Sequence, residues 1–231
     1  MLRKSLSSMV FVLALILAPL PAFGIPTLQL ITDPGVYDTT TQTWITSAAD
    51  FTLSAFAVDP TDDAILCVAL SEDLFYLDAS NNVVFEPGTS ITIDGVTLTA
   101  ADFVYGLPPI STINPDGGGG DLGPHEIYPT AFAEIVIDID AAGTIFDTQP
   151  LSGGGFGSYQ DGYIYDFAIT DAVAGIHFDL YILDDEDRIL DKAPFSHDAE
   201  TGTPPVPEPM TLLLLGSGLA SIAVLKRRKI L

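Results

Sequence analysis

Four aspartates lie close together in the C-terminal third of the chain, where their carboxylates could bind a metal ion. Asp184, Asp185 and Asp187 stand within four residues, and Asp191 follows four positions later. Calcium binds six to eight oxygen atoms, often supplied by carboxylates and backbone carbonyls of a loop. The sequence therefore makes these four residues the best candidates for calcium ligands, although they lack the central glycine and distal glutamate of an EF-hand. The alternative is a solvated acidic turn.

Two further acidic groups could also supply oxygen ligands. One lies in a predicted turn and the other ends a predicted strand; the residues are Asp59, Asp62 and Asp63, and Asp138 and Asp140. A glycosidase needs two carboxylates at a defined separation, and a chain this rich in carboxylates offers any separation. A secreted carbohydrate-active hydrolase that uses Asp and Glu is therefore one alternative function, and a passive glycan-binding module is another.

Sugar binding would also need exposed aromatic side chains. Four of them cluster near a glycine-rich loop at 153–155, and strand or core positions explain them better than a sugar platform: Phe156, Tyr159, Tyr163 and Tyr165.

Nothing in the sequence forms a recognisable catalytic constellation. His125 next to Glu126, in a loop bounded by prolines, is the best candidate for acid–base chemistry. His177 falls in a strand pattern, which is typical of a packed or surface histidine. No His-Glu-x-x-His zinc spacing, phosphate loop or dinucleotide fingerprint occurs. The only cysteine, Cys67, lies in an apolar run and is expected to be a buried structural thiol. We therefore expect a protein that is not an enzyme.

Short strands separated by turn residues must position any site. Residues 51–58, 131–139, 162–169 and 175–183 alternate apolar and polar side chains with period two. Asp94-Gly95, between two β-type segments, predicts a two-residue hairpin. Outside the termini no helical period is convincing. The fold class is therefore predicted to be all-β, an antiparallel β-sandwich or jelly-roll-like domain.

The charge of this β-rich region is strongly negative. Residues 25–204 contain two basic residues, Arg188 and Lys192, against thirty acidic ones, a net charge of −28. A surface this negative repels nucleic acid, so no nucleic acid partner is expected. It fits either binding of divalent cations or simple solubility.

The N-terminal residues predict export. Arg3 and Lys4 are followed by an apolar stretch from Met9 to Leu17 and then by prolines and small residues. This order is typical of a secretory signal peptide, residues 1–24, with cleavage between Gly24 and Ile25 by signal peptidase after transport by the secretion machinery.

The C-terminal residues predict a membrane segment behind a stiff motif. Val206, Pro207, Glu208 and Pro209 precede sixteen uncharged residues at 210–225, close to the minimum for a transmembrane helix. A basic stop follows and keeps the tail on the cytoplasmic side; its residues are Lys226, Arg227, Arg228 and Lys229.

These three elements resemble the PEP-CTERM sorting signal of Gram-negative bacteria. The resemblance implies recognition by an exosortase, a membrane-embedded processing enzyme, and removal of the span. It also implies export across the inner membrane, transient anchoring by the C-terminal helix, and then a cell-surface or extracellular location.

A second resemblance concerns the exported region. Segments at 35–38, 43–44, 123–130 and 132–134 look similar to exported bacterial proteins called choice-of-anchor N, a family that brings no activity with it. The organisation expected is a signal peptide at 1–24, a β-rich domain at 25–192, a proline-rich linker at 193–205 and the sorting signal at 206–231. The function expected is that of a non-enzymatic surface or extracellular-matrix protein that binds calcium or polysaccharide.

Overall fold

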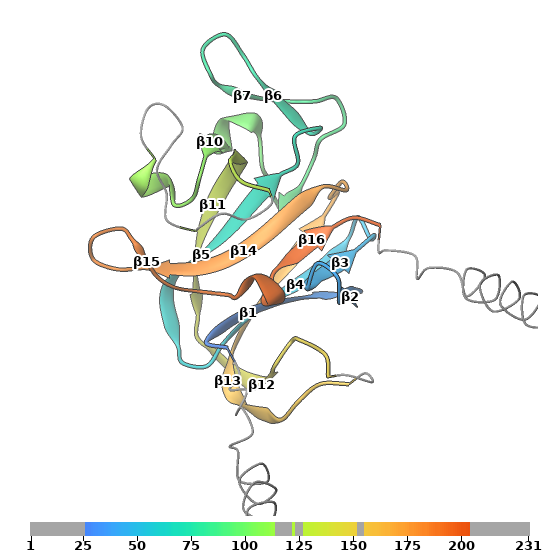
Figure 1. The fold of residues 1–231 in the computed structure, drawn as a ribbon, viewed down its shortest axis with the longest axis vertical. Helices are drawn as coiled ribbons and strands as arrows, with labels where there is room; N and C mark the ends of the chain where they lie inside the picture. Colours follow the sequence, from blue (N-terminus) through green and yellow to red (C-terminus); the bar gives the residue numbers. More distant parts are fainter. Residues whose placement is uncertain (1–25, 114–121, 123–126, 152–154, 204–231) are drawn as a thin grey trace, which may run out of the picture.

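Two β-sheets lie face to face in the computed structural model of the chain (Figure 1). The structure describes residues 26–113, 122, 127–151 and 155–203; the signal peptide, the sorting signal and the His125–Glu126 pair lie outside these ranges. Strands make up almost all of the regular structure, with three short 3-10 helices η1 (Ala100–Asp102), η2 (Ile110–Thr112) and η3 (Phe195–His197). The prediction of an all-β fold is confirmed.

The first sheet has six strands. The order along it is β1-β4-β13-β8-β9, with β12 also paired to β13, and all of its pairs are antiparallel. Its strands are β1 (Leu28–Asp33), β4 (Phe51–Ala57), β8 (Thr92–Ile93), β9 (Val96–Thr97), β12 (Ala141–Phe146) and β13 (Tyr159–Thr170). Asp94 and Gly95 join β8 to β9 with φ angles of 50° and 79°, as a tight hairpin turn requires.

The second sheet has eight strands, in the order β10-β11-β5-β14-β16-β3-β2, with β15 also paired to β14. Its strands are β2 (Val36–Asp38), β3 (Thr43–Thr46), β5 (Thr61–Leu70), β10 (Val104–Gly106), β11 (Thr130–Ile139), β14 (Ile176–Leu183), β15 (Ile189–Lys192) and β16 (Ala199–Thr201). A separate hairpin pairs β6 (Phe75–Leu77) with β7 (Val83–Phe85). The strand pairs of this sheet are antiparallel except for one, because β16 runs parallel to β3.

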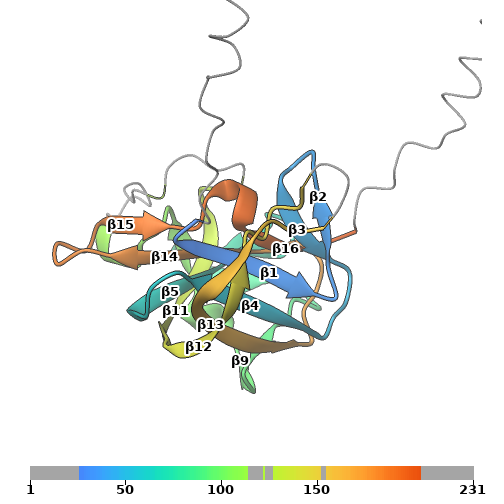
Figure 2. The ribbon, with the colours of Figure 1, turned by 90° about the horizontal axis from the view of Figure 1, so that it is seen from below.

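The main core fills the space between the two sheets. Strand β4 turns Phe51, Leu53, Ala55 and Ala57 inward, as its period-two pattern predicts. Phe51 meets Phe178 of the opposite sheet edge to face, with ring centroids 6.1 Å apart. Figure 2 shows β1, β4 and β13 crossing over the strands of the larger sheet.

The larger sheet is also covered on its outer face. A second apolar cluster forms there between β5, β11 and β14 and the described part of the segment from Leu107 to Tyr128. Residues 64–70 of β5 are consequently all buried, because alternate side chains enter the two clusters. The side chains of His177, Asp179 and Tyr181, on this outer face of β14, are therefore enclosed.

Residues 193–203 belong to the folded domain, which corrects the predicted linker at 193–205. Ala193 is buried, η3 follows, and β16 pairs with β14 on one side and β3 on the other. This strand has three residues of mixed polarity, so its pattern is too short to indicate a strand; the backbone hydrogen bonds to both neighbours hold it. In the described ranges, none of the helices has the length and apolar character needed to cross a membrane.

Candidate functional site

The predicted calcium ligand Asp184 begins the turn between β14 and β15, and its carboxylate already has partners. Oδ1 accepts hydrogen bonds from the backbone N–H groups of Glu186 and Arg188, both at 2.9 Å. Oδ2 accepts from Nε and Nη2 of Arg188 at 3.0 and 2.7 Å. The Arg188 side chain, followed by these backbone bonds, lowers the pKa of the Asp184 carboxyl. An arginine therefore takes the position that a bound cation would need.

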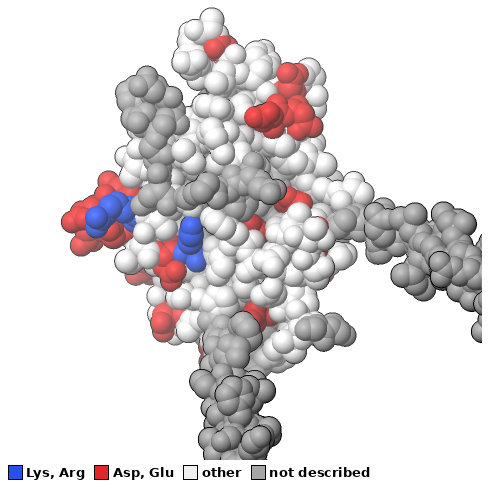
Figure 3. Space-filling model, viewed as in Figure 1, with Lys and Arg blue, Asp and Glu red and all other residues white. Residues whose placement is uncertain are grey.

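The other three predicted ligands spread along the same hairpin. Asp185 and Asp187 are exposed in the turn, whereas Asp191 lies in β15 opposite Ile182. Figure 3 shows basic side chains next to acidic ones at this end of the molecule. We call residues 184–188 the Asp184 turn. The calcium hypothesis for these four residues stays a prediction.

Two of the other acidic groups are brought into contact. Asp138, in β11, accepts a hydrogen bond at 3.1 Å from the backbone N–H of Asp63, in β5. Asp63 has a φ of 53°, and this bond helps to hold its left-handed conformation. The carboxylate acts here as a local support of the backbone.

A group that sequence reasoning missed lies on the outer face of the larger sheet. His177 and Asp179 are two residues apart on β14, so both side chains leave the same face. His177 pairs with Glu200 and Phe178 with Ala199 in the antiparallel register. The same register continued by one residue brings Asp198 opposite Asp179. We call these four residues, His177, Asp179, Asp198 and Glu200, the His177 cluster.

The imidazole is the centre of this cluster. Its Nε2 atom lies 3.5 Å from Oδ1 of Asp179 and 3.5 Å from Oδ2 of Asp198, while Nδ1 lies 4.0 Å from Oε2 of Glu200. His177, Asp179 and Asp198 are 4, 3 and 1 % exposed. In the described part of the chain this is the one set of three potential ligands whose ligand atoms all lie within 4.8 Å of one another.

The carboxylates control the charge of the imidazole. Burial by itself lowers the pKa of His177, but the charge of Asp179, its hydrogen bond and the contributions of Glu200 and Asp198 together raise it to about 10. At neutral pH the metal-free cluster therefore contains an imidazolium. A histidine in this state cannot act as a general base near pH 7. The cluster can hold a proton firmly, or it can hold another cation in its place.

A buried hydrogen-bond chain extends from the cluster to the second apolar cluster. Tyr128 donates its hydroxyl proton to Oδ2 of Asp179 at 2.7 Å, and Sγ of Cys67 lies 3.3 Å from the same hydroxyl oxygen. Burial raises the pKa of the Cys67 thiol well above its usual value, so the prediction of a buried structural thiol is confirmed. Tyr128 thus connects β5 to β14 through Cys67 and Asp179.

The sequence contains a signal for the cluster, but only as a pair. His177-x-Asp179 and Asp198-x-Glu200 each place two polar side chains on one face of a strand. Neither triplet is diagnostic alone, and the second lies in the segment that was predicted to be a linker. Recognising the site requires knowing that β14 and β16 are neighbours.

His197 is also buried but forms a separate ion pair. Its Nε2 atom lies 2.8 Å from Oδ1 of Asp147, and Nδ1 lies 2.8 Å from Oγ of Ser196. Asp147 is only partly buried. One histidine with one half-exposed carboxylate is a structural contact, and it provides a matched control for His177.

The predicted aromatic group is only partly assembled. Phe146 brings Phe156 and Tyr159 together, with ring centroids 4.4 and 5.3 Å from its own. Tyr163 and Tyr165 instead pack against the main core. Of this group Tyr159 is the exposed member, at 62 %. A single exposed ring offers a small contact area for a sugar.

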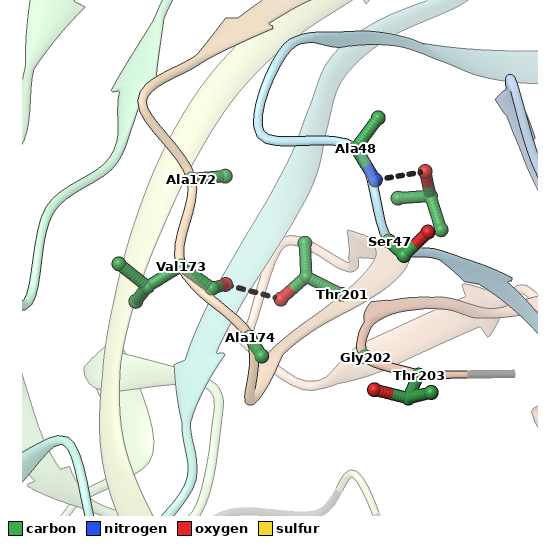
Figure 4. A pocket seen from close by; sticks show the side chains of 9 residues that line it. Ser47, Ala48, Ala172, Val173, Ala174, Thr201, Gly202 and Thr203 are labelled. Carbon is green, nitrogen blue, oxygen red and sulfur yellow. Dashed lines mark hydrogen bonds between the residues drawn. The ribbon is translucent and has the colours of Figure 1, made fainter.

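A small cavity of about 100 Å³ lies where the described chain ends (Figure 4). It lies between residues 46–48, 172–174 and 201–203. Thr201 donates its hydroxyl proton to the carbonyl of Val173 at 2.6 Å, and the N–H of Ala48 is bonded to Oγ1 of Thr46 at 3.2 Å. No titratable side chain lines it. Its walls fix the last strand in place, and no acid–base chemistry is available there.

The residues that follow this last strand in the sequence match a known family model. A family model described as the PEP-CTERM protein-sorting motif matches residues 205–229. The chain carries a PEP-CTERM sorting motif. This motif marks proteins that an exosortase sorts to the cell surface of Gram-negative bacteria. No curated protein and no solved structure matches the chain.

The PEP-CTERM match includes all the C-terminal residues that the sequence singled out. Val206, Pro207, Glu208 and Pro209 fall inside it, as do the predicted span at 210–225 and the basic residues 226–229. The predicted resemblance to PEP-CTERM proteins is therefore confirmed. The span itself lies outside the described residues, and the resemblance to choice-of-anchor N proteins stays a prediction.

Proposed function

We propose that this protein is a non-enzymatic component of the cell surface or extracellular matrix, delivered there as an exosortase substrate. The observation that carries the proposal is the PEP-CTERM motif at residues 205–229. It begins immediately after a folded β-sandwich whose last strand, β16, ends at Thr201. A folded domain followed directly by a processing signal is the arrangement expected of a sorted cargo.

The fold supports a protected boundary between domain and motif. Gly202 donates its backbone N–H to the carbonyl of Thr46 at 2.8 Å, so the domain remains bonded up to the residue after β16. Only Thr203, Pro204 and Pro205 separate that bond from Val206. Processing at the motif would therefore leave the sandwich intact.

The absence of activity is part of the proposal. Among the described residues, the set of three His or Asp side chains with ligand atoms within 4.8 Å of one another is enclosed, with His177, Asp179 and Asp198 at most 4 % exposed. Catalytic groups must reach the atoms they act on. Cys67 is fully buried with a raised pKa, which disfavours a role as nucleophile.

The sorting proposal is tested by changing Glu208 and Pro209 to alanine and following the mass of the chain in membrane and extracellular fractions. We expect an uncut precursor that stays in the membrane. The matched control changes Thr203 and Pro204, which precede the matched residues, and should be processed normally. Normal processing of the Glu208 and Pro209 variant would refute recognition by an exosortase.

A polysaccharide panel separates the non-enzymatic role from the two alternatives. A hydrolase that uses Asp and Glu would release reducing sugar, and a single carboxylate substitution would abolish the release. A glycan-binding module would be retained on a column without turnover. We expect no release, whereas retention would give the surface role a polysaccharide partner.

A further inference from the structure

The distances inside the His177 cluster are close to those between two ligands of one metal ion. Nε2 of His177 lies 3.5 Å from a carboxylate oxygen of Asp179 and 3.5 Å from one of Asp198. Ligands bound at about 2.0–2.2 Å to one tetrahedral ion are about 3.3–3.6 Å apart. The two distances from His177 match this spacing, and all three ligand atoms lie within 4.8 Å of one another.

The charges of the cluster also favour a cation. Within the described residues, the carboxylates of Asp179, Asp198 and Glu200 all face the imidazole of His177. A divalent ion held by a neutral imidazole and two carboxylates would balance the two negative charges of Asp179 and Asp198.

The surroundings hold the ligand atoms in position. The Tyr128 hydroxyl donates to Oδ2 of Asp179 at 2.7 Å and leaves Oδ1 on the side of His177. Glu200 lies on the Nδ1 side of the ring, opposite the nitrogen that faces the two aspartates. A carboxylate behind a histidine and a hydrogen-bond donor behind an aspartate are the usual supports of metal ligands.

We propose that His177, Asp179 and Asp198 bind one divalent transition metal ion, with zinc as the best fit. An imidazole ligand disfavours calcium and magnesium, which prefer oxygen. Zinc accepts histidine nitrogen and aspartate oxygen in a four-coordinate shell. His177, Asp179 and Asp198 supply three of the four ligands of such a shell.

The bound ion would connect two strands that are distant in sequence. His177 and Asp179 belong to β14, whereas Asp198 directly precedes β16, the last strand before the PEP-CTERM motif. With Cys67 as its only cysteine, the chain cannot form an internal disulfide. A metal that binds the folded chain adds its binding free energy to folding, and here it would stabilise the C-terminal strand.

The test uses the full-length chain purified in a mild detergent, stripped with chelator and then supplied with zinc. We expect about one zinc ion retained per chain after dialysis. The unfolding temperature Tm should rise by about 5–10 °C when free zinc exceeds its dissociation constant about 100-fold. Millimolar calcium should not displace the zinc, which separates this site from weak binding to surface carboxylates.

Two substitutions in the site and one control locate the ion. His177→Gln and Asp198→Asn should each lose the retained zinc and the rise in Tm. His197→Gln, which alters the other buried histidine, should keep both. Retention of zinc by both site variants, or no retained zinc and no shift in Tm for the unaltered chain, overturns the proposal.

A spectrum of the unaltered chain keeps the test decisive where a variant does not fold. Cobalt(II) loaded in place of zinc should give the intense visible absorption of a tetrahedral site with mixed nitrogen and oxygen ligands. The weak absorption of octahedral cobalt would contradict the proposed geometry.

Discussion

Two acidic groups at opposite ends of β14 differ in almost every property that matters for binding a cation. The Asp184 turn gathers four acidic residues in consecutive positions, is solvent-accessible, and contains its own counterion in Arg188. The His177 cluster takes its carboxylates from two strands, is enclosed, and has a histidine at its centre. The first is obvious in the sequence, and the second exists only in the fold.

The comparison teaches that carboxylate density along a sequence is a weak indicator of a metal site. Consecutive residues in a turn point in different directions and remain hydrated, and the Asp184 carboxylate accepts hydrogen bonds from nearby backbone and from Arg188. Cross-strand neighbours on one face point the same way. When such a face is covered, the carboxylates lose their hydration. A nearby cation then offsets the free-energy cost of burying their charge.

The largest difference between the two groups is expected from a substitution of His177. We expect His177→Gln to cost about 3–5 kcal/mol of unfolding free energy even in the presence of chelator, because it leaves buried carboxylates without their imidazolium partner. Chemical denaturation followed by circular dichroism measures this value. His197→Gln should cost less than half as much, because the Asp147 side chain is 24 % exposed and can be rehydrated. Equal losses for the two variants would show that burial of the carboxylates is not the cause.

Tyr128 provides the next largest effect on the buried side. We expect Tyr128→Phe to lower the unfolding free energy by about 2 kcal/mol, since it removes a buried hydrogen bond to the Asp179 carboxylate. Tyr165→Phe removes the same kind of bond, to Asp94 at 3.0 Å, at an exposed position. Its cost should stay below about 1 kcal/mol. A loss for Tyr165→Phe as large as that for Tyr128→Phe would contradict the role of burial.

The accessibility of Cys67 gives an independent measure of how well the second apolar cluster, on the outer face of the larger sheet, is shielded from solvent. We expect a thiol reagent to leave Cys67 unmodified in the native chain and to modify it fully in denaturant, because the thiol is buried and its pKa is raised. The rate of modification in native buffer should follow unfolding. Rapid labelling without unfolding would contradict the burial of Cys67 in the native chain.

The Asp184 turn should show a local effect with almost no change in stability. NMR titration should give a pKa for Asp184 below the usual 3.8, and Arg188→Gln should bring it back toward that value. A lowered pKa stabilises the fold above the unfolded value, and this contribution is lost as the pH falls through the folded pKa. Arg188→Gln should change Tm at neutral pH by no more than about 2 °C.

Calcium should have the smallest effect, which tests the hypothesis made for Asp184, Asp185, Asp187 and Asp191. Because Arg188 already neutralises Asp184, we expect millimolar calcium to shift Tm by less than about 2 °C. A larger shift that disappears in Asp187→Asn would establish the turn as a calcium site after all. The comparison between the two acidic groups would then have to be reversed.

Much of the fold could be predicted from the sequence because its strands obey simple rules. Residues 51–58 and 175–183 alternate regularly, and β4 and β14 match them within a residue or two. The pair Asp94-Gly95 predicts the hairpin turn that joins β8 to β9. The strand β5 is less evident, because burial on both faces replaces alternation by a continuous apolar run. The short strand β16 has too few residues to show any period.

The site could not be predicted for a related reason. His177 and Asp198 are neighbours through a pairing between distant strands, and no local pattern specifies which strands pair. The sorting motif is the opposite case, since its recognition depends on consecutive residues and is legible without a fold. Local signals thus indicate where the protein is sent, and long-range pairing determines what its folded part can bind.

The position of β16 has a consequence for the order of events during export. Among the described strands, β2 and β3 join the larger sheet only through β16, whose residues are among the last before the sorting motif. If the chain crosses the inner membrane from its N-terminus, the β2–β3 hairpin emerges well before β16, the strand with which β3 pairs. The larger sheet closes only once residue 201 has crossed. Completion of the fold would then coincide with the arrival of the PEP-CTERM motif at the membrane.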